Sequence, residues 1–130
     1  MQQASDIREV GNYGAYQGKA DYVRNDLGIK NISSCSDGAE PDFAADAVYG
    51  IDGFVLQCVR DGVEAAGYFR SRRELWQDKV LIMTDVSQGL VPVDAEQRAF
   101  REMNGRLMLY LAAEAGQVHR VFCGLGKRVK

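Results

Sequence analysis

A glycine-containing segment before a predicted helix has the clearest chemical pattern in the sequence. The segment reads Gly14-Ala15-Tyr16-Gln17-Gly18-Lys19-Ala20. A phosphate-binding loop needs glycines that turn successive N–H groups toward an anion, a lysine that reaches the β- and γ-phosphates, and a helix amino terminus behind them. Gly14, Gly18 and Lys19 supply these parts. The segment is therefore a candidate binding loop for ATP or GTP, with Lys19 as a candidate catalytic residue.

This segment departs from the full phosphate-loop motif, G-x-x-x-x-G-K-[ST], at two positions. Tyr13 stands where the first glycine belongs, and Ala20 replaces the hydroxyl residue that would bind Mg²⁺. The preceding stretch, Asp6–Asn12, is polar, which predicts against a central strand there. Taken alone, the segment fits a glycine-rich turn with a surface lysine equally well.

Two acidic residues follow predicted strands directly. Asp85 comes after the strand predicted over Lys79–Thr84, and Asp52 comes after the strand predicted over Ala47–Ile51. Ligands of open α/β sheets bind at the carboxyl ends of the strands, where an acid in phosphoryl-transfer proteins holds Mg²⁺. We therefore predict Asp85 as a catalytic and metal-binding residue and Asp52 as a second catalytic residue. The alternative is that both acids terminate strands or cap helices.

Hydrophobic periodicity predicts strands that alternate with helices around these residues. The strands are predicted over 29–35, 47–51, 79–84 and 117–123, and the helices over 19–26, 54–60, 63–77 and from Asp94 onward. The continuous apolar run Val80–Met83 is typical of a strand that is covered on both faces. The alternation predicts an α/β fold, a three-layer sandwich with a mostly parallel sheet, which with the candidate phosphate loop is P-loop NTPase-like.

The long helix has clear start and burial signals. Asp94 and Gln97 fit a capping box, in which the cap carboxylate accepts a backbone N–H. A buried stripe is predicted at Phe100, Met103, Leu107 and Leu111, and pairing along the exposed side at Arg98, Glu102 and Arg106. In the preceding helix, the basic cluster Arg70–Arg73 indicates a solvated face rather than a phosphate site.

Length and composition limit the class of protein. The chain has 130 residues, which fits a single domain over 1–130, and its 46% hydrophobic and 26% charged content excludes general disorder. A net charge of -2 argues against a nucleic-acid partner. No apolar run approaches the roughly eighteen residues of a membrane span, and the polar amino terminus shows no secretory signal. Three cysteines without a CxxC pair and one histidine favour free thiols over a zinc site, so we expect a cytoplasmic protein.

The carboxyl-terminal half resembles a known family. The segment Lys79–Pro92 has an apolar strand, an acid, and a glycine-containing loop that ends in an apolar pair and proline. This resembles the adenosylcobinamide kinase/adenosylcobinamide-phosphate guanylyltransferase family. The next helix matches at Arg98, Phe100, Arg101, Gly105, Arg106 and Leu111, and the carboxyl terminus matches at Gly124-Leu125-Gly126. The resemblance covers residues 79–130 and extends in part to Gly14–Lys19 and Ala47–Asp52.

The resemblance implies a role in cobalamin biosynthesis. Members of the family phosphorylate the aminopropanol hydroxyl of adenosylcobinamide and then attach GMP through a histidine-linked intermediate. It therefore implies a nucleotide, Mg²⁺ and a corrinoid as ligands, and a homo-oligomer. In this chain the region that should contain the nucleophilic histidine is shortened and has none. His119 is predicted near the start of the last strand, roughly 17 Å from the phosphate edge, so the guanylyl-transfer step is predicted to be lost.

Three functions remain open on the sequence. The first is a cobinamide kinase that retains only the phosphoryl-transfer step. The second is a catalytically degenerate member that binds a nucleotide or corrinoid, or serves as a subunit for a partner. The third is a P-loop kinase for another small hydroxylated substrate, because substrate pockets are not specified by these motifs.

Overall fold

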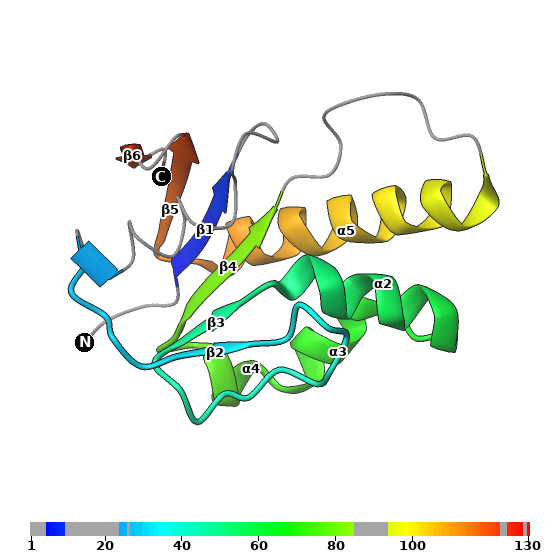
Figure 1. Cartoon of the computed structure of the whole chain (residues 1–130), viewed down its shortest axis with the longest axis horizontal. Helices are drawn as coiled ribbons and strands as arrows, with labels where there is room; N and C mark the ends of the chain where they lie inside the picture. The colour runs from blue at the N-terminus through cyan, green and yellow to red at the C-terminus, as the bar shows by residue number, and fades with distance from the viewer. Residues whose placement is uncertain (1–4, 10–23, 26, 85–93, 123–124, 129) are drawn as a thin grey trace.

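The fold is built on one mixed sheet with five parallel strands. The computed structural model describes residues 5–9, 24–25, 27–84, 94–122, 125–128 and 130. Within them, six strands lie in the order β2-β3-β4-β1-β5-β6 (Figure 1). Their bounds are β1 Ser5–Glu9, β2 Ile32–Ser34, β3 Ala47–Tyr49, β4 Val80–Thr84, β5 Gln117–Phe122 and β6 Leu125–Arg128. All neighbours pair in parallel except β5 and β6, which confirms the mostly parallel α/β fold.

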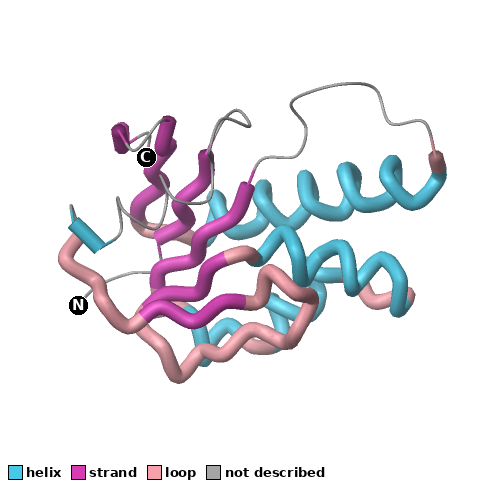
Figure 2. Tube along the Cα trace, viewed as in Figure 1, coloured by secondary structure: helices cyan, strands magenta, loops and turns pink. Residues whose placement is uncertain are grey.

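The helices lie mainly on one side of this sheet (Figure 2). Their bounds are α2 Ile51–Asp61, α3 Ala65–Ser71, α4 Arg73–Trp76 and α5 Ala95–Glu114. The main core joins Val48, Leu81 and Met83 of the sheet to apolar residues of α2, α3 and α5. On the opposite face, Ala47 and Ile82 are buried against Leu27, Ile29 and their neighbours. The apolar strand β4 is thus covered on both faces, as its sequence predicts. Of the predicted helix 19–26, only residues 24 and 25 are described, and both are helical.

The expectation that the polar amino-terminal stretch would not form a central strand was wrong. Residues Ser5–Glu9 form β1, which lies between β4 and β5 and pairs with both in parallel. Pairing on two sides satisfies the backbone N–H and C=O groups of this strand whatever its side chains are. Strand preference depends on such tertiary context more than on local composition.

Helix α2 begins earlier than the sequence predicts, because Gly50 ends β3. Gly50 has a φ of 78°, and a Cβ at this position would lie only 2.0 Å from Ser36 Oγ. Only glycine therefore fits the left-handed turn beside the loop that follows β2. The strand ends at Tyr49 rather than Ile51, and the helix starts at Ile51 rather than Phe54. This change places Asp52 in the first turn of α2.

The helix predicted over Val63–Gln77 is two helices separated at Arg72. Arg72 has a φ of -118° and a ψ of 23°, outside helical geometry. Its guanidinium lies 3.8 Å from the centre of the Tyr68 ring and donates a hydrogen bond to the Tyr68 carbonyl. After the break, Trp76 is buried and donates its indole N–H to the Phe69 carbonyl at 2.7 Å.

Helix α5 has the predicted cap and buried face. The Asp94 carboxylate accepts the Gln97 N–H at 2.7 Å, and Met103, Leu107 and Leu111 are buried. Arg106 was expected to pair with Glu102 on the same helix. Its guanidinium instead donates a hydrogen bond to the Glu64 carboxylate at 2.9 Å. This partner comes from the connection between α2 and α3, which sequence spacing within one helix does not reveal.

The carboxyl-terminal strands correct one expectation. β5 has the predicted position but is not the last strand, because β6 returns beside it in antiparallel orientation. Among the described helices, none is both long and apolar enough to cross a membrane.

Candidate functional site

The carboxyl ends of β1 and β4 lie side by side in the sheet. Glu9, the last residue of β1, is level with Thr84, the last residue of β4. The chain leaves both strands at the same edge, which is where open α/β sheets bind ligands. The candidate phosphate loop, Gly14–Ala20, follows the first strand in sequence, and Asp85 follows the second. Both lie outside the residues that the structure describes.

Two buried side chains hold the backbone of Thr84. Asp52 accepts a hydrogen bond from the Thr84 N–H at 3.1 Å, and the Asn104 amide donates one to the Thr84 carbonyl at 3.0 Å. Asp52 is 9% exposed, Asn104 is 1% exposed and Thr84 is 7% exposed. We call this arrangement the Thr84 clamp. It fixes both polar backbone groups of the last residue of β4, which directly precedes Asp85 in the sequence.

The two side chains of the clamp come from separate helices. The early start of α2 places Asp52 in the first turn of that helix, beside the end of β4, and Asn104 lies on the buried face of α5. The sequence reasoning found Asp52 but missed Asn104. The available signal was a polar residue in step with the apolar stripe of a helix, since such a residue is buried only when it is hydrogen-bonded. The oxygen of the Asn104 side-chain amide, Oδ1, is buried and has no hydrogen-bond partner among the described residues.

The donors at this edge are of the type that Mg²⁺ prefers. The Asp52 carboxylate, the Thr84 hydroxyl and the Asn104 amide oxygen are hard oxygen ligands. Within the described ranges, no group of three or more His, Cys, Asp or Glu side chains could hold a metal by itself.

His119 lies in the middle of the sheet rather than near its far edge. It is level with Ile7 in β1, which in turn is level with Ile82 in β4. The last residue of β1, Glu9, is two positions beyond Ile7. At the rise of a parallel strand, His119 therefore lies roughly 7 Å along the strand direction from the carboxyl edge, so the predicted 17 Å was too long. His119 is 8% exposed, and its Nε2 lies 3.0 Å from Gln117 Oε1. Burial rather than distance separates this histidine from the edge.

The basic cluster Arg70–Arg73 makes contacts within the protein. The guanidinium of Arg70 lies 4.9 Å from the centre of the Tyr110 ring, and that of Arg72 stacks on Tyr68. Arg73 forms an ion pair with Glu114. Arg70 and Arg73 are exposed, which supports the interpretation of the cluster as a solvated face, and its cations contact aromatic rings and a carboxylate of the protein itself.

The buried cysteines are inert thiols. Cys35 and Cys58 are free, as predicted, and Cys123 lies outside the described residues. Burial, with a smaller effect of the Asp52 charge, raises the pKa of Cys35 to about 12. Burial also raises the pKa of Cys58 to about 11. Reactive cysteines have lowered pKa values, so neither thiol is a candidate nucleophile.

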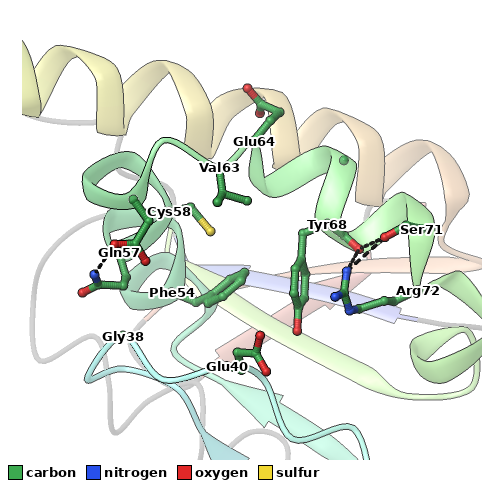
Figure 3. Close-up of a pocket in the computed structure, with 12 residues that line it drawn as sticks. Gly38, Glu40, Phe54, Gln57, Cys58, Val63, Glu64, Tyr68, Ser71 and Arg72 are labelled. Atoms are coloured by element: carbon green, nitrogen blue, oxygen red, sulfur yellow. Dashed lines mark hydrogen bonds between the residues drawn. The ribbon is translucent and has the colours of Figure 1, made fainter.

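A pocket of about 530 Å³ lies between α2, α3 and the loop that follows β2 (Figure 3). Two aromatic rings and three carboxylates contribute to its lining, which consists of Gly38, Glu40, Phe54, Gln57, Cys58, Asp61, Val63, Glu64, Gly67, Tyr68, Ser71 and Arg72. The volume is within the roughly 300–1,000 Å³ of small-molecule sites. Nothing in the sequence pattern indicated this pocket, because its residues come from three separate segments.

Comparison with known families shows to which family the chain belongs. Residues 63–129 match the family model of cobinamide kinase/cobinamide phosphate guanyltransferase. The chain belongs to this family. The match starts earlier than the predicted resemblance and includes α3, α4, β4, Asp85, α5 and both carboxyl-terminal strands. No curated protein matches the chain significantly.

Family membership establishes the general setting of the protein. The cobinamide kinase/guanyltransferase family is P-loop-like, acts in cobalamin biosynthesis, and uses a nucleotide and cobinamide. The parallel pairing of β1 with β4 agrees with such a fold. The matched range does not include Gly14–Ala20 or Asp52, so the functional roles of these residues stay predictions.

Proposed function

We propose that this chain transfers the γ-phosphoryl group of ATP or GTP to the aminopropanol hydroxyl of cobinamide. The observation that supports this most directly is the register of Glu9 with Thr84. It brings together the ends of the two strands that precede the candidate phosphate loop and Asp85. Family membership over residues 63–129 supplies the substrate class.

Each part of the proposed site has a defined task. The N–H groups of Gly14–Ala20 cradle the phosphates, and Lys19 neutralises charge on the β- and γ-phosphates. Asp85 would hold Mg²⁺, and the bound ion would neutralise further charge on the phosphate oxygens. Asp52 takes part by holding Thr84, and so orients the chain just before Asp85. In the reaction, the hydroxyl oxygen bonds to the γ-phosphorus, the bond to the β–γ bridging oxygen breaks, and a nucleoside diphosphate and a proton are released.

The guanylyl-transfer step is proposed to be absent. A covalent histidine intermediate needs an imidazole that reaches the α-phosphate. The sequence contains one histidine, and that residue, His119, is buried in β5 beside Gln117. The chain therefore lacks an accessible nucleophile for this step.

A degenerate binding protein is the second candidate function. It is favoured by Ala20, which removes the hydroxyl that would bind Mg²⁺ directly, and by Tyr13, which removes a loop glycine. Such a protein would bind a nucleotide or corrinoid without turnover. It would share the site described above but not the reaction.

Calorimetric titration with ATP and GTP, with and without Mg²⁺, followed by a cobinamide phosphorylation assay, distinguishes the two functions. We expect binding and turnover. Lys19→Ala should weaken nucleotide binding by about 1.5–3 kcal/mol, the range for hydrogen bonds to charged groups. Asp85→Asn should lower turnover by orders of magnitude while the fold persists. Lys30→Ala, which removes an exposed lysine before β2, is the matched control.

Three results separate the possibilities. Binding without turnover identifies the degenerate protein. Equal nucleotide affinities for the parent and Lys19→Ala would show that the glycine-containing segment is only a turn. Full turnover in Asp85→Asn, together with lower stability, would show that Asp85 is a structural strand-end residue.

A further inference from the structure

We propose that the pocket between α2, α3 and the loop after β2 binds cobinamide, the phosphoryl acceptor. The pocket would bind the carboxamide N–H groups at the edge of the cobinamide ring. This inference rests on the proposed function, and assigns a place to the substrate that the phosphate edge alone does not provide. Cobinamide has an apolar ring bordered by carboxamide side chains. A pocket for part of it needs flat apolar walls and hydrogen-bond acceptors, and the pocket has both.

The apolar wall is formed by two aromatic rings. The centres of the Phe54 and Tyr68 rings lie 4.8 Å apart, and Figure 3 shows both at the middle of the pocket. Tyr68 is held in place from behind by Arg72, whose guanidinium stacks on it at 3.8 Å and donates to Ser71 Oγ at 3.0 Å. A ring fixed in this way presents an ordered face to a ligand at low entropic cost.

The charge of the pocket matches amide donors and opposes phosphate. Its lining includes three carboxylates, Glu40, Asp61 and Glu64, and one cation, Arg72. Glu64 is paired with Arg106, and Asp61 accepts a hydrogen bond from Gln57. Glu40 has no hydrogen-bond or ion-pair partner among the described residues and lies beside the two rings (Figure 3). An exposed carboxylate next to aromatic rings is a good acceptor for N–H groups and repels a triphosphate.

The loop that bears Glu40 is anchored on both sides. Gly38 has a φ of 93° and approaches α2 so closely that a Cβ would lie 3.2 Å from the Gln57 side chain. Asp37 accepts the Ala39 N–H at 3.1 Å, and Phe43 packs edge-on against Phe69 with ring centres 5.8 Å apart. The backbone that bears Glu40 is therefore held in place before a ligand arrives.

Helix α2 connects the Thr84 clamp to the pocket. Asp52, in the Thr84 clamp, and Gln57, in the pocket, are five residues apart on this helix. At the helical geometry this is roughly 7.5 Å along the axis and roughly 140° around it, so the acceptor must pass around α2 as well as along it. An acceptor whose ring edge occupies the pocket can extend its aminopropanol arm toward the edge of β4, whereas the nucleotide occupies the edge itself.

Cobinamide binding to the parent and to two charge-reversal variants tests the proposal. Equilibrium dialysis, read by the visible absorption of the corrin ring, gives the dissociation constant. Glu40→Lys should weaken cobinamide binding tenfold or more and leave ATP and GTP affinity unchanged. Glu74→Lys reverses the charge of another exposed glutamate, on α4 and outside the pocket, and should bind like the parent. Glu40→Gln should give an intermediate loss, because the amide still accepts a hydrogen bond.

The failure of this proposal is distinguishable from that of the proposed function. If the parent binds cobinamide and Glu40→Lys binds it equally well, the acceptor lies elsewhere and only the pocket assignment is wrong. If Glu40→Lys changes nucleotide affinity but not cobinamide affinity, the pocket is a nucleotide site and the assignment is overturned. If the parent does not bind cobinamide at all, both the assignment and the proposed function fail.

Discussion

Replacing Asp52 by alanine tests whether α2 holds the end of β4. The variant loses the 3.1 Å bond from the Thr84 N–H to Asp52 Oδ1 and leaves that donor without its acceptor. Hydrogen bonds to charged groups contribute about 1.5–3 kcal/mol net. Because Asp52 and Thr84 are both less than one-tenth exposed, water cannot readily replace the lost acceptor. We expect the free energy of unfolding to fall by about 2–3 kcal/mol.

Two further variants separate charge from hydrogen bonding. Asp52→Asn keeps an acceptor oxygen but loses the charge. Since charge-assisted bonds are roughly twice as strong as neutral ones, it should lose about 1 kcal/mol. Asp61→Ala, at the exposed end of the same helix, should change stability by less than about 0.5 kcal/mol. Urea unfolding at pH 7, followed by circular dichroism, measures all three variants, provided that the slope with denaturant is unchanged.

A double-mutant cycle with Asn104→Ala tests the clamp as a unit. Both side chains bond the backbone of Thr84, so their losses should be non-additive by at least about 0.5 kcal/mol. Additive losses would show two independent contacts. An Asp52→Ala variant as stable as the parent would refute the clamp. A more stable one would indicate a carboxylate held at a cost for direct catalysis, as is common at active sites.

Two other predictions follow from buried groups. Incubation with α-labelled GTP and Mg²⁺ should leave no acid-labile, base-stable label on the protein, and His119→Ala should behave like the parent in nucleotide assays; a label that disappears in this variant would show that guanylyl transfer is retained. Because burial raises the pKa of Cys35 to about 12 and that of Cys58 to about 11, the unfolded chain releases thiol protons above pH 9 that the folded chain keeps. The free energy of unfolding should therefore fall between pH 9 and about pH 11, less steeply in Cys58→Ala than in the parent by urea titration; equal slopes would contradict this origin.

Local patterns in the sequence were sufficient to predict elements whose burial or capping depends on residues close together in the sequence. The apolar run of β4 and the cap and stripe of α5 depend on residues a few positions apart, and the structure has both. The family was also recognisable from the segment after Lys79, because it combines an apolar strand, an acid and a glycine-containing loop in a fixed order. Asp52 was predicted as a catalytic residue because it is an acid close behind a strand; the structure shows its hydrogen bond to Thr84, and its catalytic role stays a prediction.

Other features depend on contacts between distant segments, and these only the tertiary structure decided. The central place of β1 follows from its pairing with β4 and β5, which compensates for its polar sequence. The end of β3 at Tyr49 follows from the approach of Ser36 to Gly50. The role of Asn104 and the pocket around Glu40 arise where separate helices and a loop meet. Local sequence determines which residues can be strand, helix or cap. Long-range packing and backbone pairing determine which of them become neighbours, and the candidate site consists of residues that only such packing brings together.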